Sequence, residues 1–187
     1  AEEDNRKIEN SLRSQYRREG LEEGIEQGIE QGTRLAKLED AKKMKEKGID
    51  LYLNAAHRIH REREDTVFHI CGKCDDAGYY SRLLRLNETG YVKYHGGVKD
   101  MRPFYGAAHC IVHPTWYPEG ISNVLLEAAA HGRPVITTDR AGCREAVNHG
   151  ETGMIIPMRD EDALVAALKR FLDMDWQKKK EMGLAGR

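Results

Sequence analysis

Residues 111–137 decide the fold, and they read IVHPTWYPEGISNVLLEAAAHGRPVIT. A β-branched apolar run stops at Pro114, and an irregular loop then leads into an apolar helical pattern that stops at Gly132. A second β-branched run starts after Pro134. The order strand, loop, helix, strand is typical of a βαβ unit, whose two strands lie parallel in one sheet.

The same alternation continues on both sides of this stretch. Short β-rich runs are found at 67–71, 92–95, 110–113, 135–137 and 154–156. Helical patterns accompany them at 49–62, 78–86, 99–107, 122–131, 142–148 and 160–173. The sequence therefore predicts an α/β fold with a doubly wound, Rossmann-like parallel sheet. Ligands of such sheets bind at the carboxyl ends of the strands, here at 72–76, 96–99, 114–122 and 138–142.

The loop that precedes the helix of this stretch is suited to an anion. Gly120 allows the backbone to approach a ligand, and Ser122 or Asn123 can cap the helix. The first amides of a helix lack intrahelical acceptors and carry the positive end of its dipole, so a diphosphate fits there. We expect one apolar stripe of this helix to face the sheet, made of Ile121, Val124, Leu125 and Ala128.

Two glutamates bracket the start of this helix. Glu127 lies just over one turn after Asn123, where its carboxylate could accept hydrogen bonds from a ribose diol. Glu119, just before the helix, would face the far end of a ligand. Each residue taken singly has an ordinary alternative, Glu119 as a partner of the helix dipole and Glu127 as a solvated glutamate.

Together the glutamates match a family pattern. Pro-Glu-Gly followed by Leu-Glu-Ala-Ala-Ala-x-Gly-x-Pro-Val-Ile resembles the retaining glycosyltransferases of family 4, which have the GT-B fold. Further segments agree with that family in order, at 45–50, 92–96, 142–145 and 149–153. The resemblance covers residues 44–187, and its Pro-Glu-Gly-Ile-Ser-Asn variant is similar to that of bacterial enzymes that build surface polysaccharides on lipid carriers.

The resemblance implies a role for each residue of the site. Glu119 would be the catalytic residue, binding hydroxyls of the donor sugar, and Glu127 would bind the ribose of a nucleotide. Backbone amides of 120–122 would hold the diphosphate, with Lys47 adding a cation. The segment 92–97 would flank the base. The donor-binding set is therefore Glu127, Gly120, Ile121, Ser122, Lys47, Val92 and Gly96.

The resemblance also implies that parts of the enzyme are missing. A GT-B enzyme has two Rossmann-like domains, and this chain has room for the donor domain only. The family's first strand, an apolar run that ends in arginine, is also not found, because Lys42 stands at that place in a helical pattern at 38–44. We therefore expect a UDP or GDP sugar as ligand, a hexosyltransferase as the whole enzyme, and a chain that is inactive without its acceptor domain.

Residues 1–43 form a second part of the chain, which we expect to be a charged helical arm. Of the first 50 residues 24 are charged. Glycines recur at every fourth position, at Gly20, Gly24, Gly28 and Gly32. Two interpretations stay open: a second helix packs on the glycine ridge and the chain self-associates, or the helix is isolated and frayed. The repeat resembles the tail of the Rpn family of recombination-promoting nucleases and putative transposases, without that family's nuclease domain. The alternative function is therefore a non-catalytic, helix-mediated oligomerisation or scaffold protein.

Composition limits the other possibilities. The 187 residues carry 30 basic and 31 acidic side chains, a balance that argues against a nucleic-acid partner. No run approaches the ~20 apolar residues of a membrane-spanning helix. The four cysteines are unevenly spaced, so we expect reduced thiols. The resulting expectation is a cytoplasmic protein, peripheral to the inner membrane face in the full-length enzyme, with no cofactor and no metal.

Overall fold

The computed structural model describes residues 30–31, 35, 38–118 and 120–187, in two compact units, 1–40 and 41–187. The described residues of the first unit, 30–31, 35 and 38–40, are helical. The glycine repeat predicted for the arm lies outside the described residues, so the arm's two interpretations both stay predictions.

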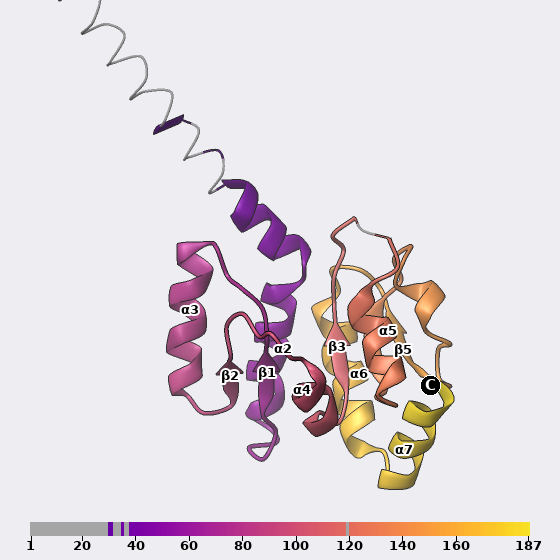
Figure 1. Ribbon diagram of the computed structural model, residues 1–187. Coiled ribbons are helices and arrows are strands. Elements are labelled where there is room, and N and C mark those ends of the chain that lie inside the picture. The colour runs from indigo at the N-terminus through magenta and orange to yellow at the C-terminus, as the bar shows by residue number, and fades with distance from the viewer. Residues whose placement is uncertain (1–29, 32–34, 36–37, 119) are drawn as a thin grey trace, which may run out of the picture. The chain divides into compact units, whose positions relative to one another are not determined.

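The second unit alternates strands with helices (Figure 1). Its strands are β1 (Phe68–Ile70), β2 (Val92–Tyr94), β3 (Ile111–His113), β4 (Val135–Thr138) and β5 (Gly153–Ile156). Its helices are α2 (Ile49–His60), α3 (Ala77–Glu88), α4 (Arg102–Ala107), α5 (Asn123–Ala130), α6 (Glu161–Asp173) and α7 (Trp176–Ala185). The predicted helix at 142–148 is reduced to a short 3₁₀ turn, η1 (Arg144–Ala146), and α7 has no counterpart among the helices predicted above.

Aspartates fix where three of the helices begin. Asp76, Asp160 and Asp175 are the N-cap residues of α3, α6 and α7, and each side chain accepts a hydrogen bond from the backbone amide three residues later, at 2.8 Å. Such caps satisfy one of the free amides of a helix start. Helix α5 is different, because its N-cap residue, Ser122, makes no side-chain capping bond.

All strand pairs are parallel, which confirms the α/β, Rossmann-like fold class. The strands form two separate sheets, one of β1 and β2 and one in the order β3-β4-β5. In Figure 1 the first sheet lies with α3 and the second with α5 and α6. Within the described residues, β1 pairs only with β2 and β3 only with β4, so one edge of each has no partner strand there.

The interruption has a physical cause in residues 38–44. A doubly wound sheet has the strand order 3-2-1-4-5-6, in which the first strand is central. The strands β1 and β2 correspond to the positions on one side of that central strand, and β3, β4 and β5 correspond to the positions on the other side. A central parallel strand is buried on both faces and needs a continuous apolar run. Residues 38–44 include four charged side chains and are helical, so they do not fill the central position.

The larger hydrophobic core nevertheless continues across both sheets. It combines Phe68 and Val92 of the first sheet with Ile136 and Met154 of the second, beneath α2 and α6. Packing of α2 and α6 therefore holds the two sheets together without a strand between them.

A smaller core lies beneath α5 and corrects one expectation. Leu125 and Ala128 are buried in it, as predicted. Ile121 and Val124 are 58% and 37% exposed, so they do not face the sheet. The apolar stripe of this helix is narrower than its sequence indicates, because the loop before Asn123 turns Ile121 outward.

Two further observations concern membrane-spanning helices and cysteines. In the described residues no helix combines the length and the apolar character that crossing a bilayer requires. The four cysteines, Cys71, Cys74, Cys110 and Cys143, are free thiols.

Candidate functional site

The loop that follows β3 is fixed on both sides by Thr115, which is fully buried. The Thr115 hydroxyl donates to the carbonyl of Glu46 at 3.2 Å, and the next amide, Trp116, donates to the same carbonyl at 2.8 Å. On the other side, the hydroxyl of Thr138 at the end of β4 donates to the carbonyl of Thr115. The predicted ligand loop is therefore held between the 46–48 turn and β4.

This arrangement brings Lys47 next to the loop. Gly48 has a φ of +79°, and a Cβ at this position would overlap the carbonyl oxygen of Pro114. Only glycine fits so close to the Pro114 backbone in the left-handed conformation. Lys47 is exposed beside this contact and is free to extend toward a ligand in front of the loop.

The start of α5 differs in detail from its prediction. The Ser122 side chain is 3% exposed, and its hydroxyl lies 3.1 Å from Nε2 of His113. The Ser122 amide donates to the carbonyl of Gly142 at 3.2 Å, so it would have to leave this bond to hold a phosphate. The amides of Asn123 and Val124 begin the helix and have no intrahelical acceptor. They are the helix amides best placed to receive an anion.

The loop after β4 packs against the backbone of Gly120. Gly142 has a φ of +89°, and a Cβ there would overlap the carbonyl oxygen of Gly120. Arg140 in the same loop is 9% exposed, with one guanidinium nitrogen 3.9 Å from Sγ of Cys143. This buried cation is not among the predicted site residues, and only its place after a strand of the sheet signals it.

Glu127 is held by a contact that the sequence did not reveal. The hydroxyl of Tyr105, on α4, donates to Oε2 of Glu127 at 2.8 Å. Tyr105 is 3% exposed and its ring stacks on His131, with ring centroids 5.0 Å apart. Burial, and then the hydrogen bond with Glu127, raise the pKa of the Tyr105 phenol, which keeps it a donor. In the described residues Oε1 of Glu127 keeps its capacity to accept from a ligand.

The turn after β2 lies beside α4. Val92 is fully buried, so its side chain does not face a ligand, and only the residues that follow it can flank a base. Gly96 has a φ of +64°, and its carbonyl accepts from the amide of Gly72 at 2.7 Å. His95 packs edge-on against Phe104, with ring centroids 4.7 Å apart.

Helix α4 thus connects two predicted parts of the site. Phe104 contacts His95 in the turn after β2, and its neighbour Tyr105 binds Glu127 on α5. The predicted base-flanking turn and the predicted ribose-binding glutamate are positioned by consecutive residues of one short helix.

The remaining predicted positions are placed less completely. Glu119 lies outside the described residues, so its catalytic role stays a prediction. Trp116 has the guanidinium of Arg159 over its ring, 5.4 Å from the centroid, and Tyr117 has the ammonium of Lys43 at 5.9 Å. These cation–π contacts favour the two aromatic residues as cover for the loop.

The expectation of a metal-free mechanism rests on the absence of an Asp-x-Asp pair, and that ground is wrong, because the sequence contains two such pairs, Asp160/Asp162 and Asp173/Asp175. Both pairs have structural roles. Asp160 caps α6 and Asp162 binds Arg58, 2.7 Å away. Asp173 binds Arg63 and Asp175 caps α7. In the part of the chain that the structure describes, no three histidine, cysteine or acidic side chains cluster as metal ligands would.

Comparisons with known proteins agree with this arrangement. The family model "Glycosyl transferases group 1" matches residues 38–174. The glycogen synthase of Mycobacterium tuberculosis is 30% identical over 132 residues, which are 68% of this chain and 31% of that enzyme. The GDP-mannose-dependent alpha-(1-6)-phosphatidylinositol monomannoside mannosyltransferase of the same organism is 31% identical over 157 residues, 75% of this chain and 39% of that enzyme.

A solved structure shows the same fold. The Anabaena protein Alr3699/HepE in complex with UDP aligns with a TM-score of 0.65 and 20% identity, over 77% of this chain and 40% of that protein. The chain thus spans between about a third and two fifths of the length of these relatives. Because the family model matches most of the chain and the fold agrees with it, the chain belongs to the glycosyl transferases group 1 family.

Proposed function

We propose that residues 44–187 are the donor-binding domain of a retaining, family 4 hexosyltransferase and bind a UDP or GDP sugar. The observation that carries this proposal is the position of α4, which supports both the turn at 94–97 and the Glu127 carboxylate. Relatives that use GDP-mannose or that were solved with UDP support a nucleoside diphosphate as the ligand.

The described residues suggest how the nucleotide would be held. The base would lie against the turn after β2, and a ribose hydroxyl would donate to Oε1 of Glu127, whose Oε2 is already bound by Tyr105. The diphosphate would accept from the amides of Asn123 and Val124 at the positive end of α5. Lys47, exposed beside the loop, would add a mobile cation.

This domain would contribute to the reaction mainly by stabilising the leaving group. As the glycosidic bond breaks, negative charge grows on the nucleoside diphosphate, and oriented amides and a lysine stabilise that charge. Glu119 would orient the sugar hydroxyls. In a retaining transfer the acceptor attacks from the face of the departing phosphate, so the acceptor domain must close over this site. We therefore propose that the chain alone binds donor without transferring sugar.

The acceptor we propose is a bacterial surface polysaccharide built on a lipid carrier. Support comes from the Pro-Glu-Gly-Ile-Ser-Asn variant and from the mannosyltransferase relative, whose acceptor is a phosphatidylinositol mannoside. The whole enzyme would then work at the inner membrane face. The glycogen synthase relative marks the alternative, a glucan acceptor.

A thermal-shift and calorimetric panel of nucleoside diphosphates tests the donor site directly. We expect UDP or GDP to raise the midpoint of unfolding of the wild-type chain in a saturable manner, because a ligand bound to the folded state stabilises it. Glu127→Ala should remove this shift. The matched control is Glu64→Ala, which removes an exposed glutamate in the turn after α2.

Two results would contradict the proposal. If no nucleoside diphosphate binds the wild-type chain, or if Glu64→Ala weakens binding as much as Glu127→Ala, the donor site is not where we place it. Hydrolysis or transfer of a nucleotide sugar by the isolated chain would overturn the proposed inactivity while leaving the binding site intact.

A further inference from the structure

A cavity of about 480 Å³ lies between α2, α3 and the start of α6. Its size falls in the range of small-molecule sites, about 300–1,000 Å³. Three arginines line it, Arg58 from α2 and Arg82 and Arg85 from α3, together with one acidic residue, Glu161. Leu53 and Leu86 supply apolar surface. The charged side chains that line the cavity are therefore mainly cationic, and apolar side chains line it as well.

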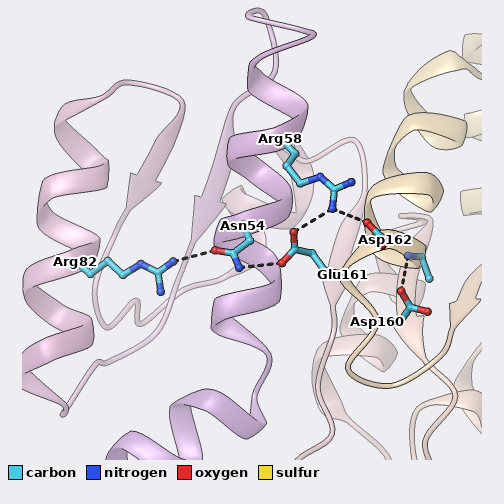
Figure 2. Close-up of polar contacts among 7 residues, drawn as sticks. Asn54, Arg58, Arg82, Asp160, Glu161 and Asp162 are labelled. Carbon is cyan, nitrogen blue, oxygen red and sulfur yellow. Dashed lines mark hydrogen bonds and ion pairs between the residues drawn. The ribbon is translucent and has the colours of Figure 1, made fainter.

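The acceptor groups of the cavity wall are already used. Figure 2 shows the chain of contacts: Arg82 donates to Asn54 at 3.1 Å, and Asn54 donates to Oε2 of Glu161 at 2.9 Å. Arg58 donates to Oε1 of Glu161 at 3.1 Å and to Asp162 at 2.7 Å. Because both oxygens of Glu161 accept bonds from the wall, the groups still available to a ligand are mainly donors.

Arg85 gives the cavity its uncompensated charge. Arg82 is paired with Asp50 at 2.5 Å and Arg58 with Glu161 and Asp162. Within the described residues Arg85 has no hydrogen bond or ion pair, and it is exposed at the cavity wall. A guanidinium in this setting presents a planar set of donors that matches a phosphate or carboxylate.

From this geometry we propose that the cavity binds a small organic phosphate, a phosphate monoester such as a hexose phosphate. The phosphate accepts hydrogen bonds from Arg85 and from the nitrogens of Arg58 other than Nη1, which already donates to Glu161 and Asp162. The organic part packs on Leu53 and Leu86. The fixed network in Figure 2 holds the arginine of α2 in place before the ligand enters, so little ordering is needed on binding.

This site is separate from the donor site. The cavity includes Thr89 and Tyr91, which precede β2, whereas the turn at 94–97 follows the same strand. None of the proposed donor-binding residues lines it. The inference therefore goes beyond the proposed function and does not depend on it.

The experiment titrates the full chain with glucose 6-phosphate, inorganic phosphate and glucose, each followed by calorimetry and by thermal shift. We expect saturable binding of glucose 6-phosphate, weaker binding of inorganic phosphate, and no binding of glucose. Arg85→Gln should weaken binding of glucose 6-phosphate by roughly tenfold or more, as the loss of a charge-assisted hydrogen bond does. Arg170→Gln, which removes an exposed arginine from the surface of α6, is the matched control and should bind like wild type.

The remaining outcomes each decide the proposal. No binding of glucose 6-phosphate to the wild-type chain, or equal weakening by Arg85→Gln and Arg170→Gln, would overturn it. Equal affinity for inorganic phosphate would overturn the organic phosphate as the ligand, because Leu53 and Leu86 would then take no part in binding. Glu127→Ala should leave this binding unchanged, and loss of binding in that variant would place the ligand in the donor site instead.

Discussion

The hydroxyl of Tyr105 lies 2.8 Å from Oε2 of Glu127 and joins α4 to α5 at the candidate donor site. A carboxylate on a helix surface has several rotamers, and binding a ligand requires one of them. The hydrogen bond from the buried Tyr105 fixes one rotamer of Glu127 and leaves Oε1 without a partner among the described residues. In the nucleotide site that we propose, Tyr105 would therefore be a positioning residue that acts through Glu127.

Tyr105→Phe is expected to weaken binding of the preferred nucleoside diphosphate about five- to tenfold, the cost of one net hydrogen bond of about 1 kcal/mol. The ring and its stacking on His131 remain, so the fold should be retained. Calorimetry with the normal nucleotide and with its 2′,3′-dideoxy form distinguishes a Tyr105 hydroxyl that positions Glu127 from one that supports only the fold. The weakening should vanish with the dideoxy nucleotide, which offers no ribose hydroxyl to Glu127.

Tyr91→Phe serves as the control for this substitution. It also removes the hydroxyl of a buried tyrosine, but one that lies near His57 and not near Glu127. Equal weakening by both variants, or the same loss with the dideoxy nucleotide, would mean that Tyr105 supports only the fold.

Much of the strand pattern could be predicted from the sequence because each strand lies in a short apolar run with glycine or proline directly before or after it. Runs such as 111–113 and 135–138 have no other way to bury their β-branched side chains, and the structure pairs them in parallel. The contact of Tyr105 with Glu127 could not be predicted in this way. It joins residues that are 22 positions apart, and its geometry depends on how α4 and α5 pack.

The exposed Ile121 shows that hydrophobic periodicity does not by itself predict where helix α5 begins. A helical pattern tells which residues share a face, but it does not tell where the loop ends and the helix begins. Helix α5 starts at Asn123, after Ser122 has bound Gly142, so Ile121 belongs to the loop. The two Asp-x-Asp pairs illustrate the converse, since a spacing common in metal sites here serves helix caps and ion pairs.

Gly48→Ala is expected to lower the free energy of unfolding by more than the same substitution does at a left-handed glycine that has no close neighbour. The added methyl group would push against the Pro114 carbonyl and displace the ligand loop from the 46–48 turn. The matched control is Gly90→Ala, where φ is also positive (+88°) but nothing lies within 4 Å of the new methyl group. Urea denaturation should show a loss about 1–3 kcal/mol larger for Gly48→Ala than for Gly90→Ala.

Equal losses in the two variants would show that the conformation alone matters and that the contact with Pro114 does not. Because the displaced loop leads to the start of α5, Gly48→Ala should also weaken nucleotide binding, whereas Gly90→Ala should not.

The free energy of unfolding should decrease as the pH is lowered and His69 becomes protonated. Partial desolvation, followed by the neighbouring His95 and Lys93, lowers the pKa of the His69 imidazole, although this side chain stays exposed. Below about pH 6.5 the unfolded chain takes up a proton at this residue before the folded chain does, so acidification favours unfolding. His69→Gln should therefore reduce the loss of unfolding free energy between pH 7 and pH 5.

His109→Gln, which removes an exposed imidazole far along the chain, provides the comparison. Denaturation curves at several pH values are the measurement. If wild type and His69→Gln lose stability in parallel as the pH falls, His69 does not contribute to the pH dependence.

Asn123→Pro tests the amides of α5 while keeping the helix. Asn123 is the first residue of the helix, a position that accepts proline, and the extended backbone of Ser122 (φ −73°, ψ 119°) suits the residue before a proline. The substitution deletes one amide donor, whereas Asn123→Ala keeps it. We expect Asn123→Pro to bind the diphosphate roughly tenfold more weakly than Asn123→Ala does. Because the lost donor would face the phosphates in the proposed site, the corresponding nucleoside should bind both variants equally. A matching loss for the nucleoside would instead show that the proline disturbs the base or ribose contacts, and equal diphosphate affinity would remove the Asn123 amide from the site.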